Sequence, residues 1–177
     1  KIGISLRVVD APNYDEKRDA LSHDWPRLLE KLGFHPIYIP NNLKHVDEFF
    51  SDMFLDGLIL SGGDNIGENK NRDQTENSLL KLAIEKKIPT FGVCRGMQLI
   101  NNYFGGEISF NNSTEHVSTN HDVEITNDKF TSIFDSNKIK VNSYHRNTIK
   151  INQVGQNLNP FAISKDDNTI EGFFHTS

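Results

Sequence analysis

Hydrophobic and polar positions follow two alternating patterns over the first hundred residues. Four short apolar runs predict strands, at residues 2–9, 36–40, 57–60 and 89–93. Four stretches with apolar positions three and four residues apart predict helices, at residues 16–32, 42–54, 73–87 and 96–104. Pro26 lies inside the first of these, so that helix is expected to begin or bend near it. Strand–helix pairs in succession predict an α/β fold with a doubly wound, mostly parallel, flavodoxin-like sheet.

The pattern changes after Gly106. Short β-rich segments follow, at residues 123–126, 139–143, 162–164 and 169–174, and no long helix is indicated. We expect a β-rich C-terminal part attached to the parallel sheet. At 177 residues, we expect residues 1–177 to form a single domain.

Composition narrows the class of protein. The hydrophobic fraction of 36% and charged fraction of 24% indicate a globular chain and exclude a disordered one. No apolar run approaches the roughly 18–20 residues of a membrane span, and the chain starts on a strand-like segment, so neither a membrane nor a targeting segment is expected. A net charge of −5 argues against nucleic acid as a partner. One cysteine cannot form an internal disulfide, which points to the reducing cytoplasm.

The candidate for chemistry is Cys94, in Gly92-Val93-Cys94-Arg95-Gly96, between a predicted strand and a predicted helix. A nucleophile on such a turn is held in a strained backbone conformation at the carboxyl edge of the sheet, with glycines that allow close approach. The helix N-terminus favours the thiolate, and the Arg95 amide can face a developing oxyanion. Elsewhere, a lone cysteine is more often a small buried hydrophobe.

A second turn, Ser61-Gly62-Gly63-Asp64, ends the preceding apolar strand. Its amides can point to the same sheet edge and supply the other half of an oxyanion hole. On its own, the turn fits an ordinary strand end equally well. The histidines show no metal-ligand spacing, so neither a metal nor a cofactor is expected.

These motifs together resemble class I glutamine amidotransferases. The segments that carry the resemblance are Gly62-Gly63-Asp64, Arg72-Asp73-x-x-Glu76, residues 89–101 around Cys-Arg-Gly-Met-Gln, Gly105-Gly106 and Asn142-Ser143-Tyr144-His145. The version of the cysteine motif is most similar to the γ-glutamyl-γ-aminobutyrate hydrolase branch.

The resemblance implies a cysteine-dependent hydrolase that cleaves γ-glutamyl amides through a thioester. It assigns the nucleophile to Cys94 and the oxyanion hole to the amides of Gly63 and Arg95. It assigns contacts with a small γ-glutamyl substrate to Gly62, Gln98, Ser143, Tyr144, His145 and Arg146.

One family feature is absent from the sequence. The His and Glu of the family's triad come from a Trp-His-Pro-Glu-like segment on a late strand, and no such segment occurs. We expect it to follow Ser177, so that this chain lacks the last catalytic strand and leaves an open sheet edge that a homodimer would cover. His145 with Glu171 is an alternative pair, although His145 matches a substrate-side position; His121 and His116 are weaker candidates.

A short loop between Asp64 and Arg72 is the second departure, because larger γ-glutamyl hydrolases carry a longer insertion there. The short loop is expected to leave the rim of the active site open, which suits a bulky leaving group. One such leaving group is a nucleotide amidate, for example the CDP-amidate of capsule biosynthesis. Positive charge for its phosphates would come from Lys70, Arg72, Arg95 and Arg146, although Lys70 fits a solvated surface cation better.

Two other functions stay open. The first is a glutaminase subunit that delivers ammonia to a synthetase partner; the second is a non-catalytic γ-glutamyl-binding relative. Glutamine hydrolysis that depends on a second protein, in contrast to hydrolysis by the isolated chain, would identify the glutaminase subunit. Binding of a γ-glutamyl compound without turnover would identify the non-catalytic relative.

Overall fold

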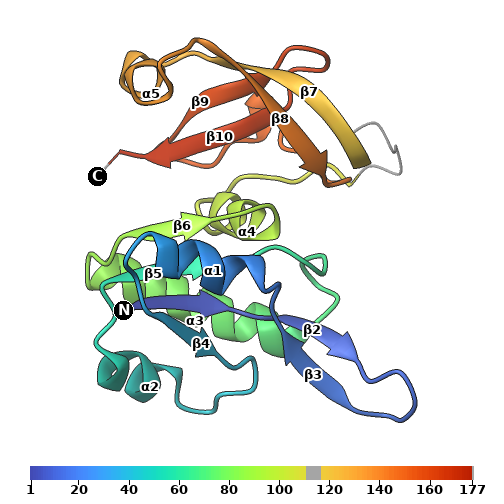
Figure 1. The fold of residues 1–177 in the computed structure, drawn as a ribbon, viewed down its shortest axis with the longest axis vertical. Coiled ribbons are helices and arrows are strands. Elements are labelled where there is room, and N and C mark those ends of the chain that lie inside the picture. The colour runs from blue at the N-terminus through green and yellow to red at the C-terminus, as the bar shows by residue number, and fades with distance from the viewer. Residues whose placement is uncertain (111–116, 177) are drawn as a thin grey trace. The chain divides into compact units, whose positions relative to one another are not determined.

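The computed structural model describes residues 1–110 and 117–176, which belong to two compact units, Lys1–Ile100 and Asn101–Ser177 (Figure 1). Each unit has a sheet of its own. That residues 1–177 form a single domain stays a prediction.

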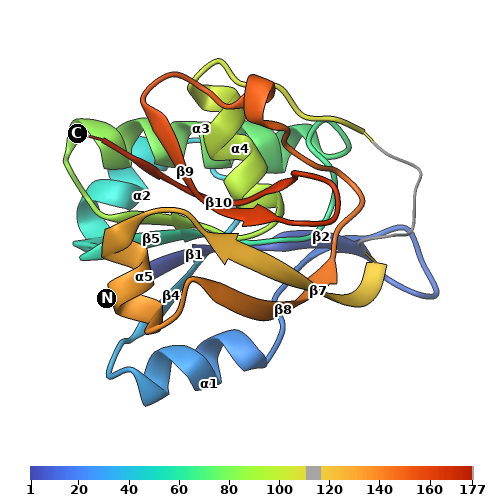
Figure 2. The same ribbon diagram turned by 90° about the horizontal axis from the view of Figure 1, so that it is seen from above.

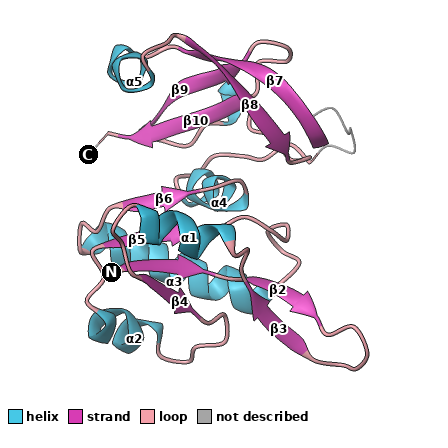
Figure 3. Ribbon diagram, viewed as in Figure 1, coloured by secondary structure: helices cyan, strands magenta, loops and turns pink. Residues whose placement is uncertain are grey.

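The first unit is built on a four-stranded parallel sheet. Its strands are β1 (Ile2–Ser5), β4 (Pro36–Ile39), β5 (Gly57–Leu60) and β6 (Thr90–Gly92), in the order β4-β1-β5-β6 (Figure 3). The register pairs Ile4 with Tyr38 on one side and with Ile59 on the other. The predicted parallel sheet is therefore confirmed, and its carboxyl edge is the edge at which β5 and β6 lead into the two glycine-containing turns.

Helices cover both faces of this sheet. Apolar side chains of β5 alternate: Ile59 packs in a cluster with Leu29 of α1 (Asp24–Lys31), whereas Leu58 and Leu60 pack in the cluster of α2 (Val46–Met53) and α3 (Lys70–Glu85). Helix α4 (Arg95–Tyr103) follows β6, and its Leu99 joins the α2–α3 cluster. This is the doubly wound arrangement that the sequence predicts.

The predicted helix over residues 16–32 is wrong in its first part. Residues Lys17–Ala20 form strand β3, which pairs antiparallel with β2 (Arg7–Asp10). Helix α1 begins only at Asp24, so that Pro26 falls in its first turn, where its missing N–H costs nothing. The predicted strand over residues 2–9 is likewise divided, because β1 ends at Ser5 before β2 begins.

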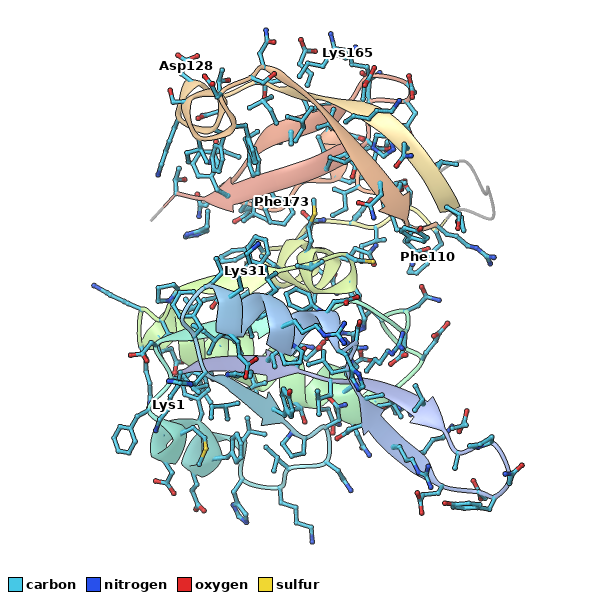
Figure 4. The ribbon with its side chains drawn as sticks, viewed as in Figure 1. Lys1, Lys31, Phe110, Asp128, Lys165 and Phe173 are labelled. Carbon is cyan, nitrogen blue, oxygen red and sulfur yellow. The ribbon has the colours of Figure 1, made fainter. Side chains whose placement is uncertain are left out.

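The second unit is a curled antiparallel sheet. Its strands, which Figure 2 labels, are β7 (Val117–Ile125), β8 (Lys138–Tyr144), β9 (Leu158–Ser164) and β10 (Ile170–His175). Their hydrogen-bonded order is β10-β9-β7-β8. The β-rich prediction is confirmed. Helix α5 (Asp128–Phe134), which begins at the labelled Asp128 in Figure 4, and the 3₁₀ turn η1 (Ile151–Gln153) were not predicted.

The described residues include no helix that is long and apolar enough to cross a membrane. Within the same residues, no group of three or more His, Cys, Asp or Glu side chains is arranged to hold a metal ion.

Candidate active site

Cys94 occupies the turn between β6 and α4, and its backbone adopts a left-handed conformation with a φ of 53°. A non-glycine residue in this region stores backbone strain, of order 1–3 kcal/mol, and such strain is concentrated at functional sites. The side chain is an exposed thiol. Because Arg95 is the first residue of α4, the sulfur lies at a helix N-terminus, where the helix dipole favours a thiolate.

Two contacts fix the geometry of the Cys94 turn. The Val93 amide donates to the Leu60 carbonyl at 3.0 Å, which ties the turn to the end of β5, and the Gly96 amide donates to the Val93 carbonyl at 3.0 Å. A Cβ atom at Gly96 would lie 2.6 Å from the carbonyl carbon of Leu60, so only glycine allows this approach. Gly92 is equally crowded, because a Cβ there would lie 2.7 Å from the Gly96 backbone.

The Ser61-Gly62-Gly63-Asp64 turn lies beside the cysteine. A Cβ atom on Gly62 would be 3.4 Å from the Cys94 Cβ and 3.9 Å from its Sγ. Gly63 has a φ of 121°, a conformation that L side chains rarely adopt. The structure therefore places Gly62 next to Cys94. That the amides of Gly63 and Arg95 form an oxyanion hole stays a prediction.

A buried ion network underlies the turn. Arg72 of α3 is completely buried, and its guanidinium donates to the Ser61 and Gly62 carbonyls at 3.0 and 2.9 Å. It also donates to Asp64 at 3.2 Å and to Glu76 at 3.0 Å. These contacts lower the pKa of Asp64 below its ordinary value: burial opposes the charged form, but the Val8 amide and Arg72 outweigh it.

Arg95 extends the same network. Its side chain is 1% exposed and donates to Glu76 and Asp73. Burial, together with the neighbouring charge of Arg72, lowers the pKa of Arg95 to about 10, so it stays a cation at neutral pH. The expectation that Arg72 and Arg95 supply charge to a substrate phosphate is wrong, since both guanidinium groups are buried and bound to internal acceptors.

Gln98 is the remaining predicted contact residue of the first unit. It lies on the first turn of α4, is 7% exposed, and its backbone amide donates to the Cys94 carbonyl at 3.1 Å. Its side chain is thus carried on the helix that begins directly after the nucleophile.

The other predicted contact residues belong to the second unit, at the end of β8. Ser143 is buried, whereas Tyr144 and Arg146 are exposed. The His145 Nδ1 lies 3.1 Å from the Asn147 carbonyl oxygen, and its Nε2 lies 3.5 Å from Glu171. Burial opposes the charged imidazole, but the hydrogen bond and charge of Glu171 outweigh it and raise the pKa of His145 above its ordinary value.

Glu171 also contacts a second imidazole. The His121 Nε2 lies 3.5 Å from the other carboxylate oxygen of Glu171, and the His121 residue is 7% exposed. His121, Val123 and Ile125 share the inward face of β7, so strand alternation alone places this histidine inside. From the sequence, His121 and His116 were the weaker candidates for the general base; His116 lies outside the described residues.

The part that Asp73 and Glu76 play in this network was not predicted. For Glu76 the sequence does carry a signal, because Arg72 and Glu76 are four residues apart on one helix and therefore share a face. Burial of that face was not visible from the spacing.

Comparisons with known proteins show which family and which proteins the chain is similar to. The Peptidase C26 family model matches residues 2–177. A γ-glutamyl-CDP-amidate hydrolase of Campylobacter jejuni is 33% identical over 181 residues, covering 98% of this chain and 82% of that protein. One subunit of the glutamine-hydrolysing GMP synthase of Methanococcus maripaludis is 34% identical over 111 residues, covering 63% of this chain and 54% of its own length.

Solved structures show the same fold. A glutamine amidotransferase from Thermotoga maritima is similar with a TM-score of 0.71 at 15% identity, covering 98% of this chain and 71% of that one. A glutamine amidotransferase from Methylobacillus flagellatus has a TM-score of 0.65 at 13% identity, covering 98% and 64%.

Proposed function

Because the chain belongs to the Peptidase C26 family of class I glutamine amidotransferase-like hydrolases, as the resemblance of its cysteine motif indicates, we propose that it hydrolyses γ-glutamyl amide bonds with Cys94 as the nucleophile. One observation carries the assignment to this residue. Cys94 combines a left-handed backbone, a helix N-terminus and an adjacent Gly62-Gly63 turn. A buried structural cysteine requires none of these features.

The first half of the proposed reaction forms a thioester. The thiolate of Cys94 attacks the γ-carbonyl carbon, and the developing oxyanion accepts hydrogen bonds from the amides of Gly63 and Arg95. The first amides of a helix lack intrahelical partners, so the Arg95 N–H can take this role. The C–N bond then breaks as the leaving nitrogen receives a proton. In the first unit, Gly62 and Gln98 are the residues that we propose to hold the γ-glutamyl group. The substrate contacts that the resemblance assigns to Ser143, Tyr144, His145 and Arg146 stay predictions.

The second half regenerates the thiol. Water attacks the thioester, a general base accepts its proton, and the C–S bond breaks to release glutamate. The family resemblance gives both proton transfers to a His that is oriented by a Glu. Among the described residues, His145 with Glu171 is the pair that could take this role.

The proposed leaving group is a nucleotide amidate. The similarity to a γ-glutamyl-CDP-amidate hydrolase and the short loop between Asp64 and Arg72 support this choice, and capsule biosynthesis is the process it suggests. Of the four cations considered for the phosphates, only Lys70 and Arg146 are exposed. Of these two, Arg146 is the stronger candidate for a contact with the phosphates.

The proposed compartment is the reducing cytoplasm, in which Cys94 would remain a thiol.

The assignment is tested with a glutamine-like electrophile, diazo-oxo-norleucine, and the full gene product. We expect one adduct, on Cys94, and loss of turnover on the order of 10³-fold or more in Cys94→Ala. Labelling of Cys94→Ser equal to that of the unaltered protein, or full turnover by Cys94→Ala, would contradict the proposal.

A second function, a glutaminase subunit that serves a synthetase, is favoured by the similarity to the GMP synthase of Methanococcus maripaludis. The two functions are separated by the leaving group and by dependence on a partner. A stand-alone γ-glutamyl hydrolase turns over γ-glutamyl amides of larger amines or amidates without a second protein, whereas a glutaminase of this kind releases ammonia from glutamine and responds to its partner.

A further inference from the structure

Three charged side chains of the first unit have no reacting role in the proposed chemistry, although they are almost completely buried. Arg72 and Glu76 are 0% exposed and Arg95 is 1% exposed. Burying a charge is unfavourable unless the charge is paired and hydrogen-bonded. A network of this kind next to the nucleophile therefore calls for a reason beyond the stability of the fold.

The fork of Arg72 fixes the turn that contains Gly63. One terminal nitrogen donates to the carbonyls of Ser61 and Gly62 at 3.0 and 2.9 Å. The carbonyl of Gly62 and the amide of Gly63 belong to one planar, trans peptide unit, so they point in opposite directions. Holding the Gly62 oxygen toward Arg72 consequently sets the direction of the Gly63 N–H.

Glu76 joins this fork to the other amide donor. One of its carboxylate oxygens accepts from Arg72 Nε at 3.0 Å, and the other accepts from Arg95 Nη1. The backbone amide of Arg95 is the second proposed oxyanion donor. A single buried carboxylate thus links the residues that position both halves of the hole.

We propose that Arg72 is a positioning residue for the reaction, an inference that rests on the proposed function. Arg72 orients the Gly63 amide through the Gly62 carbonyl, and Glu76 links Arg72 to Arg95. Glycine at position 63 is adaptable, so without the clamp this peptide would rotate among several conformations.

The charge of Arg72 acts in the same direction. Arg72 interacts electrostatically with Cys94, in the sense that a negative sulfur favours the Arg72 cation. The same attraction favours the thiolate over the thiol.

Two variants of the full gene product separate orientation from charge. In Arg72→Lys the cation remains, but a single ammonium cannot bind both carbonyls and Glu76 in the planar fork. We expect kcat to fall about tenfold with KM within twofold, and the pH midpoint of Cys94 alkylation by iodoacetamide to be unchanged. In Arg72→Met we expect a loss of about 10²-fold or more in kcat and a midpoint moved to higher pH.

All rates are taken per active site counted by diazo-oxo-norleucine labelling, so unfolded protein does not contribute. Arg27→Met removes an exposed arginine of α1 and should change neither quantity. If Arg72→Met does not fold, Glu76→Gln replaces it: the fork is loosened, and kcat should fall while KM stays within twofold.

A purely structural Arg72 would lower the melting temperature but leave kcat per labelled site and the alkylation midpoint unaltered in both variants, and that result would overturn the inference. It would leave the proposed function intact as long as Cys94→Ala is inactive. Full turnover by Cys94→Ala would instead remove the proposed function and this inference with it.

Discussion

Gly96 of α4 lies directly against the carbonyl group of Leu60 at the end of β5. A Cβ atom on Gly96 would be 2.6 Å from the Leu60 carbonyl carbon and 2.8 Å from its Cβ, both closer than non-bonded atoms approach. The close contact brings the start of α4 to the sheet edge and is held by the Val93–Leu60 hydrogen bond of 3.0 Å. The position of the nucleophile therefore depends on the absence of one methyl group.

Gly96→Ala should lower the free energy of unfolding by about 3 kcal/mol, since the obstructing atoms belong to backbone that cannot move aside cheaply. Urea unfolding monitored by circular dichroism measures the loss. The matched control is Gly33→Ala, where φ is 80° but nothing lies within 4 Å of the added carbon. That variant should lose only about 1 kcal/mol, the cost of the left-handed backbone. Equal losses in the two variants would contradict the packing argument.

Asn101 offers a second test, within the second unit. Its buried amide donates to the Glu107 and Gln153 carbonyls at 2.9 and 3.0 Å and accepts from the Gly155 amide at 2.9 Å. Asn101→Asp turns two donations into contacts between oxygens and buries a charge, so we expect a loss of about 3 kcal/mol. The adjacent Asn102 is exposed, and Asn102→Asp should change the free energy of unfolding by about 0.5 kcal/mol or less. A comparable loss in Asn102→Asp would show that α4 is disturbed by any added charge.

Glu171 should control the ionisation of His145. The 3.5 Å contact raises the pKa of His145, so the stabilisation is fully present below the imidazole's unfolded pKa of about 6.5 and is lost as the pH rises through the folded value. Glu171→Gln removes the charge while keeping the shape, and should lower the pKa of His145. Titration of the His145 ring proton by NMR measures the shift. Glu124→Gln, on the exposed face of β7, serves as the control, and an unmoved His145 titration in Glu171→Gln would rule out the pairing.

The sequence predicted the parts of the molecule that local chemistry determines. The apolar strand at Gly57–Leu60 and the glycines flanking Cys94 carry their own signals, and both the sheet and the turn were correctly placed. The segment Lys17–Ala20 was misassigned because its pairing with β2 is a tertiary effect that overrides a helical spacing. Arg72 of α3 and Arg95 of α4 were misread for a related reason, since the sequence shows where each cation lies on its helix but not that its side chain is buried.

The leaving group provides the last test, and Arg146 is the residue on which it depends. This side chain is exposed beside Ser143–His145, and an arginine can bind a phosphate through two parallel hydrogen bonds. We expect Arg146→Ala to raise KM for a γ-glutamyl nucleotide amidate about tenfold or more, with little change for a γ-glutamyl amide of a small amine. Lys140→Ala removes an exposed cation of β8 and should affect neither substrate. Steady-state kinetics on both substrates, with the full gene product, decides the matter. An equal rise of KM for the two substrates would place Arg146 on the glutamyl end, and no rise for either would remove it from the binding site.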